Sequence, residues 1–214
     1  MEMQNQIKEY VAQYEKEVRK LADQLRNECM PQPTEELFSE FETNGNRIRY
    51  EAVYFGRRKF LSVLGLASVI WHEKEDIQKL EEVIREICAE ECWALPAHVR
   101  RKENPNWRGV IDLFASETGQ TLAHITTLLK DELSEEVITL AQNEVKARIL
   151  KPFIESKVPY ASWEQFFLFC SFLHKKKSCT SHIATANSIP IIRCLFPACV
   201  STKRIQSIKG SYGI

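Results

Sequence analysis

The sequence predicts an all-α domain followed by an irregular C-terminal tail, and two observations support that prediction. Between residues 4 and 150, apolar side chains recur at three- and four-residue steps, which is the period of an amphipathic helix. No segment before residue 160 alternates apolar and polar side chains as a half-buried strand does. The connections between the helical segments are short, so neighbouring helices are expected to run antiparallel as hairpins.

Two helices are predicted before residue 50. Residues 4–28 carry a regular apolar stripe that either docks on the domain or pairs with a partner helix. Pro31-Gln32-Pro33 interrupts the chain, and Thr34 has the position and the side chain of an N-cap for the short helix that follows. Asn44-Gly45-Asn46 then supplies the residue types that end a helix.

Longer helical segments follow. Residues 51–71 are apolar on nearly every side, which predicts a helix in the interior, and residues 76–92 form an amphipathic helix. Two more helices are predicted over residues 110–130 and 134–150. Pro152 is expected to kink or end the last of them. Buried helices that alternate with amphipathic ones indicate an arrangement in which inner helices are covered by outer helices.

Charge divides the chain into unequal parts. The 214 residues have a formal net charge of zero, which gives no general nucleic-acid footprint. Residues 1–164 carry 29 acidic and 22 basic side chains, whereas residues 165–214 carry 7 basic and no acidic ones. We therefore expect an N-terminal helix over residues 1–30, a helical domain over residues 31–164, and a basic tail. Our hypothesis is that the tail is a frameshifted or otherwise replaced sequence, which sequencing of the encoding DNA tests.

Cysteine content and hydropathy indicate the compartment. The 7 cysteines are an odd number and no signal-peptide pattern opens the chain, so reduced thiols in a cytoplasmic protein are expected. No apolar run reaches the roughly 18 residues of a transmembrane helix, so no membrane partner is expected. Cys88 and Cys92 are four residues apart, but no second cysteine pair has ligand spacing, so we expect neither a metal nor another cofactor.

The segment Trp93-Ala94-Leu95-Pro96-Ala97-His98 is the strongest candidate for a ligand site. It places an aromatic ring and an imidazole after one predicted helix, and Asp112 and Glu117 open the next. A stacking face with fixed donors and acceptors is what a carbohydrate groove requires. The alternative is a helix terminator followed by an ordinary helix, with Asp112 as its N-cap.

The loop between these two helices is basic. It contains Arg100-Arg101-Lys102, and Trp107 closes it. Cationic side chains next to aromatic rings suit a polyanionic glycan as well as they suit phosphate. The alternative is a solvated loop that binds nothing.

Residues 34–164 resemble the N-terminal helical domain of heparinase II/III-like proteins. The resemblance rests on motifs in the same order and at similar spacing: Tyr54-Phe55-Gly56-Arg57-Arg58, Trp93-Ala94-Leu95-Pro96-Ala97-His98, Ile111-Asp112-Leu113-Phe114-Ala115-Ser116-Glu117-Thr118-Gly119 and Lys151-Pro152-Phe153. It implies a partial α/α toroid and a polysaccharide lyase that performs β-elimination on uronic-acid-containing glycans. The implied partner is an acidic polysaccharide or oligosaccharide.

The resemblance also implies which residues contact substrate. These are Trp93 and His98, together with Arg57 and Glu117. The family's carboxylate-neutralising Asn or His, and its Tyr and His for proton transfer, fall beyond the region that matches. We therefore expect no catalytic residue here, and a truncated lyase that is inactive alone. The alternative is a non-catalytic helical module that binds a glycan or a protein.

Overall fold

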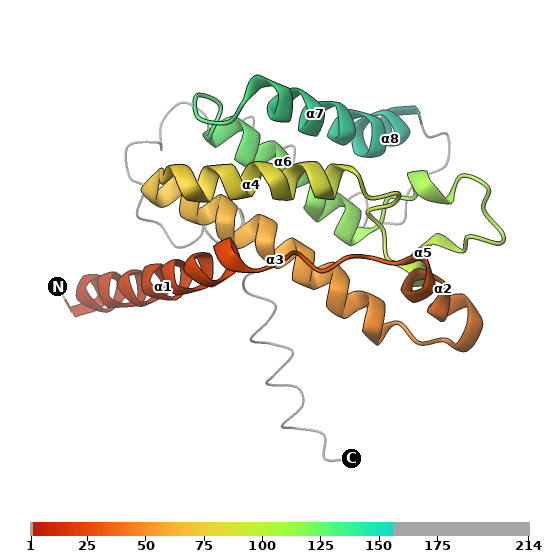
Figure 1. The fold of residues 1–214 in the computed structure, drawn as a ribbon, viewed down its shortest axis with the longest axis horizontal. Helices are drawn as coiled ribbons and strands as arrows, with labels where there is room; N and C mark the ends of the chain where they lie inside the picture. The colour runs from red at the N-terminus through yellow and green to blue at the C-terminus, as the bar shows by residue number, and fades with distance from the viewer. Residues whose placement is uncertain (1, 156–214) are drawn as a thin grey trace, which may run out of the picture.

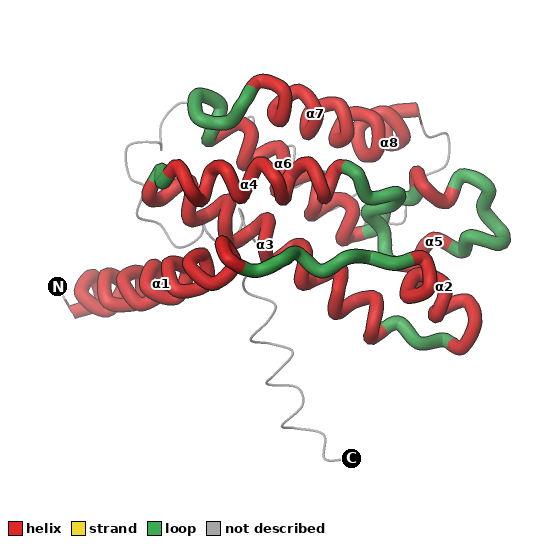
Figure 2. Tube along the Cα trace, in the orientation of Figure 1, coloured by secondary structure: helices red, strands yellow, loops and turns green. Residues whose placement is uncertain are grey.

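A computed structural model of the chain describes the backbone of residues 2–155 and the side chains of residues 12–155. Every regular element within residues 2–155 is a helix (Figure 2), which confirms the all-α prediction. In chain order the elements are α1 (Glu2–Asn27), α2 (Glu35–Asn44), α3 (Ile48–Trp71), α4 (Lys74–Cys88), α5 (Pro96–Val99), the 3-10 turn η1 (Trp107–Gly109), α6 (Leu113–Leu128), α7 (Glu135–Val145), the π-helical turn η2 (Lys146–Leu150) and α8 (Lys151–Glu155). The predicted tail over residues 165–214 lies outside the described residues.

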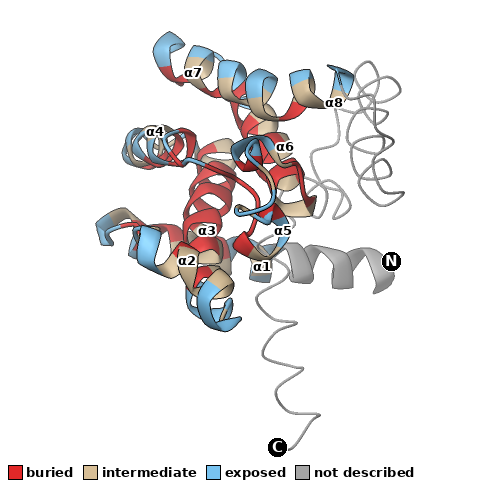
Figure 3. Ribbon diagram, turned by 90° about the vertical axis from the view of Figure 1, so that its right-hand side faces the viewer, coloured by how far each residue is buried: buried red, intermediate tan, exposed pale blue. Residues whose placement is uncertain are grey.

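Helix α3 is the centre of the domain, as its apolar surface predicts (Figure 3). Helices α1, α2, α4 and α6 pack around it, and α7 lies outside, against α4 and α6 (Figure 1). The apolar residues of α3 are buried almost without interruption from Phe60 to Ala67. None of the helices within residues 2–155 combines the length and the apolar character that crossing a membrane requires.

The second half of α1 docks on the domain. Val18 and Leu25 of the predicted stripe are buried against the core. Two arginines of α1 reach the start of α4, where Arg19 pairs with Glu73 at 2.5 Å and Arg26 Nε lies 2.8 Å from Asp76 Oδ1. This part of the apolar stripe therefore packs against the domain of its own chain. A partner helix for the first half of α1, which projects from the domain (Figure 1), stays a prediction.

Some predicted helix boundaries are wrong. The helix predicted over residues 76–92 ends at Cys88, because the chain turns there to bring Glu90 and Trp93 into the interior. The predicted loop over residues 94–108 contains two short elements, and Pro96 occupies the first position of α5, where its missing N–H costs nothing.

The helical path continues past Pro152. The chain stays helical from α7 through η2 into α8, which includes Pro152. Proline lacks the N–H that an α-helical bond needs, and its ring clashes with the preceding turn. The wider π-helical turn of residues 146–150 lies immediately before it and accommodates the interruption.

Candidate functional site

A buried ionic cluster anchors the segment that follows α4. Glu90 Oε1 accepts hydrogen bonds from Arg57 Nε at 2.5 Å and from Arg58 Nη1 at 2.7 Å, and Oε2 accepts one from Arg58 Nη2 at 2.7 Å. All three side chains are buried. Arg58 Nε also donates to Thr118 Oγ1 of α6 at 2.9 Å. One carboxylate thus accepts hydrogen bonds from two guanidinium groups and ties α3 to the site segment.

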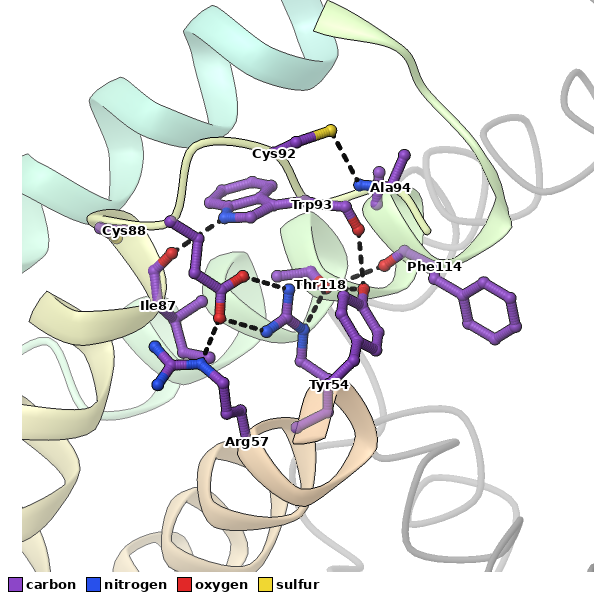
Figure 4. Close-up of polar contacts among 12 residues, drawn as sticks. Tyr54, Arg57, Ile87, Cys88, Cys92, Trp93, Ala94, Phe114 and Thr118 are labelled. Atoms are coloured by element: carbon purple, nitrogen blue, oxygen red, sulfur yellow. Dashed lines mark hydrogen bonds and ion pairs between the residues drawn. The ribbon is translucent and has the colours of Figure 1, made fainter. Parts of the chain in front are cut away.

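Arg57 is committed to this cluster. Its Nη1 donates to Pro31 O at 2.9 Å and to Glu86 Oε2 at 3.3 Å, and its Nη2 donates to Glu86 O at 3.0 Å. Arg57 is 2% exposed, and Figure 4 shows its side chain reaching from α3 toward α4. The structure therefore gives Arg57 a role in joining α3 to α4, and substrate contact by Arg57 stays a prediction.

Trp93 is also an interior residue. Its side chain is 2% exposed, and its indole Nε1 donates to Ile87 O at 3.0 Å (Figure 4). The hydroxyl of Tyr54 donates to Trp93 O at 2.8 Å, and Arg148 lies over the indole ring at 5.0 Å. In this arrangement the ring packs against protein and presents no face on which a sugar could stack.

Asp112 holds the two halves of the site together. It is the N-cap of α6, with Oδ1 accepting from Ala115 N at 2.7 Å, which confirms the capping alternative. Its Oδ2 accepts from Leu95 N at 3.0 Å and lies 2.7 Å from His98 Nδ1. The buried carboxylate therefore fixes α5 and its preceding segment against the start of α6.

The accessible part of the site is a rim formed by His98, Phe55, Phe114 and Glu117. The side chain of His98 is 40% exposed, and its ring is parallel to that of Phe114 with centroids 6.3 Å apart. Phe55 packs edge-on against Phe114 at 5.3 Å. Glu117 follows Phe114 by one helical turn, so both project from neighbouring positions on α6. We call this set the His98 rim.

Two of the four predicted contact residues lie at this rim, and the sequence did not point to its aromatic members. His98 and Glu117 are partly accessible, whereas Arg57 and Trp93 are interior. Phe114 could have been recognised, because it lies three residues before Glu117, and positions three apart are neighbours on one face of a helix.

The carboxyl group of Glu117 has an unusual environment. Burial, helped by the nearby negative charge of Asp112, raises the pKa of Glu117 from 4.5 to about 7. Below about pH 7 the folded protein therefore favours the protonated carboxyl group of Glu117, which can donate a hydrogen bond as well as accept one.

We expect the stability of the protein to fall as pH rises from about 4.5 to about 7. Over that range the unfolded state ionises Glu117 while the folded state keeps it protonated, so deprotonation favours unfolding. The full shift corresponds to about 3 kcal/mol, and partial exposure reduces the expected effect to about 1–2 kcal/mol. Glu117→Gln should raise the free energy of unfolding by that amount near pH 8 and leave it unchanged near pH 4. Urea denaturation measures both, with Glu103→Gln, an exposed glutamate, as the control.

The basic loop is largely neutralised by its own neighbours. Arg101 contacts Glu35 at 2.6 Å and Ser39 Oγ at 2.9 Å, and it lies over the rings of Phe38 and Trp107. Arg108 pairs with Glu91 at 3.2 Å. Much of the positive charge that suggested polyanion binding is thus paired, which favours the alternative of a solvated loop.

The cysteines of the site segment are buried thiols. Burial raises the pKa of Cys88 to about 12 and that of Cys92 to about 11, so both stay protonated near neutral pH. Among the described residues, no group of three or more His, Cys, Asp or Glu side chains is arranged to hold a metal ion. The thiols of Cys88 and Cys92 therefore act as small packing groups.

Comparisons with known proteins do not assign the chain to a family. No protein-family model matches the chain, and no curated protein matches it at a significant level. The resemblance to heparinase II/III-like proteins therefore rests on the residue motifs of this sequence alone.

Proposed function

We propose that the helical domain is the glycan-binding part of a heparinase II/III-like polysaccharide lyase, a class that cleaves uronic-acid-containing glycans by β-elimination. The observation that supports this most is the His98 rim, where the imidazole that contacts the buried Asp112 lies parallel to an aromatic ring, and a carboxyl group follows that ring by one helical turn. An aromatic ring offers a sugar an apolar face. The imidazole and the carboxyl group offer hydrogen bonds to its hydroxyl and carboxylate groups.

The helix arrangement supports an α/α toroid. Hairpin α3–α4 lies beside hairpin α6–α7, with α3 against α6 and α4 against α7. An inner layer of α3 and α6 and an outer layer of α4 and α7 is what two neighbouring hairpins of a toroid would form. An apolar groove of about 780 Å³ along α6, α7 and α8 would be the open edge of this incomplete toroid. Its lining includes Ala123, Thr126, Ala141, Val145, Leu150 and Ile154.

We propose binding without cleavage for the described residues. The lyase chemistry needs an accessible group, commonly Tyr or His, to remove a proton from the uronate ring. The tyrosines near the rim, Tyr50 and Tyr54, are buried, and burial raises the pKa of both. Neither can reach a bound sugar in this arrangement.

The burial of these tyrosines equally favours the alternative, a non-catalytic helical module that binds a glycan or a protein. Formation of an unsaturated product, followed by its ultraviolet absorbance, separates a lyase from a binding module. A module that binds only proteins would show no affinity for any uronic-acid-containing oligosaccharide.

We expect the full chain to bind a heparosan tetrasaccharide, which carries uronate carboxylates, and His98→Ala to weaken that binding about tenfold. The loss corresponds to one hydrogen bond between His98 and a hydroxyl group of the sugar. Isothermal titration calorimetry measures both affinities.

Two controls make this test specific. Chitotetraose, which has no carboxylates, should bind much more weakly. His72→Ala should leave the affinity unchanged, because His72 is an exposed histidine whose Nδ1 pairs with Glu132 at 2.7 Å, away from the rim. If the wild-type chain does not bind the tetrasaccharide, or if the two histidine variants behave alike, the proposed function is wrong.

A further inference from the structure

The carboxylate of Asp112 receives N–H groups from three separate places in the chain. Its Oδ1 accepts from Ala115 N in α6, and its Oδ2 accepts from Leu95 N and lies 2.7 Å from His98 Nδ1. Asp112 itself is 2% exposed. Backbone N–H groups donate to both oxygens of Asp112, so each oxygen is already held as a hydrogen-bond acceptor.

This arrangement determines how His98 is protonated. Since Asp112 Oδ2 can only accept, His98 Nδ1 must carry the proton in that hydrogen bond. In the neutral ring the other nitrogen, Nε2, is then an acceptor with a free lone pair. The side chain of His98 is 40% exposed and its Nδ1 contacts the buried carboxylate, so the edge that carries Nε2 is turned away from Asp112.

The local backbone and the neighbouring ring hold His98 in this orientation. Leu95 and Pro96 start α5, and His98 N donates to Leu95 O at 2.9 Å, which closes the turn below the imidazole. The ring of Phe114 lies parallel to the imidazole, at an interplanar angle of 7°. Both the position of the ring and its tautomer are therefore set before a ligand arrives, which lowers the ordering cost of binding.

We propose that Asp112 is a positioning residue that presents His98 Nε2 to the ligand as a hydrogen-bond acceptor. The inference rests on the proposed function, because it assigns His98 Nε2 to a hydroxyl group of the bound glycan. Asp112 does not touch the ligand; it acts through the tautomer of His98 and through the segment that Leu95 anchors.

Long-range 1H–15N NMR of the imidazole rings in the full chain tests this inference without any ligand. At a pH where His98 is neutral, the wild-type ring should carry its proton on Nδ1. Asp112→Asn keeps an oxygen for the Ala115 N–H, but its amide group donates toward His98 Nδ1. That variant should move the proton of His98 to Nε2 and weaken heparosan tetrasaccharide binding about tenfold, the loss of one hydrogen bond.

Glu132→Gln is the matched control. Glu132 contacts His72 Nδ1 at the same 2.7 Å, but at an exposed site, so this change should alter neither the His98 tautomer nor the affinity. If Asp112→Asn does not fold, Asp112→Ser replaces it, because serine also caps a helix but is too short to reach the imidazole. In the serine variant, His98 should lose its fixed Nδ1–H tautomer, and tetrasaccharide binding should weaken as much as in Asp112→Asn.

The outcomes separate the inference from the proposed function. A wild-type His98 that carries its proton on Nε2 overturns the inference, whatever the protein binds. An Asp112 variant that changes the tautomer and keeps full affinity overturns the positioning role while leaving glycan binding intact. A wild-type chain with the Nδ1–H tautomer but no affinity for the tetrasaccharide overturns the proposed function and, with it, the assignment of Nε2 to a glycan hydroxyl.

Discussion

Glu90→Gln is expected to lower the free energy of unfolding by about 3–5 kcal/mol, the usual cost of leaving a buried charge without its partner. The carboxylate of Glu90 is the acceptor for Arg57 Nε and for both terminal nitrogens of Arg58. Glutamine removes the negative charge and turns one acceptor into a donor that faces a guanidinium group. Urea denaturation of the full chain, followed by circular dichroism, measures the change.

The neighbouring residue supplies the control for this prediction. Glu91 is exposed and pairs with the exposed Arg108 at 3.2 Å. A surface pair of this kind contributes at most about 1 kcal/mol, so Glu91→Gln should change stability little. Equal effects of the two substitutions would show that the buried ionic cluster does not hold the site segment in place.

Gly119→Ala is expected to destabilise the protein by about 1–3 kcal/mol, the typical cost of overpacking a core. In an exposed helix the same change would stabilise by up to about 1 kcal/mol, because alanine favours the helix. Here a Cβ at position 119 would lie 2.9 Å from Ile149 Cγ1. Ile149 is 4% exposed and belongs to η2, whose Arg148 donates to Cys88 O at 3.0 Å, so the turn cannot easily move away.

Gly109→Ala is the matched control for Gly119→Ala. A Cβ at position 109 would meet no atom within 4 Å, so a change of less than about 1 kcal/mol is expected. Thermal unfolding of both variants gives the comparison. A Gly119→Ala protein as stable as the wild type would mean that α6 and η2 are not in close contact.

The fold was predictable wherever helical periodicity was strong. The interior position of α3 and the capping of α6 by Asp112 follow from residue types alone. The end of α4 does not follow from residue types. The helical pattern of the sequence continues past Cys88, and the helix ends there because of the tertiary contacts of Glu90. A signal was present in Arg57-Arg58, since two arginines at the edge of the apolar part of α3 require a carboxylate partner if they are buried.

The site was predictable in part. The sequence placed His98 near Asp112 and Glu117, and the structure brings His98 and Asp112 into contact. It could not tell that Trp93 would face the interior, because an aromatic ring after a helix suits a core and a groove equally well. Trp93 is held in the interior by the hydrogen bond from its indole to Ile87 O. The position of Ile87 relative to Trp93 is known only once the chain has folded.

Chemical-shift mapping of the full chain during titration with the heparosan tetrasaccharide tests the central claim most directly. If the His98 rim binds uronic-acid-containing glycans, the largest shifts should occur at His98, Phe114 and Glu117. The buried Arg57 and Trp93 should shift less. Shifts that cluster on another face, or no shifts at all, would contradict the assignment of a glycan site to this rim.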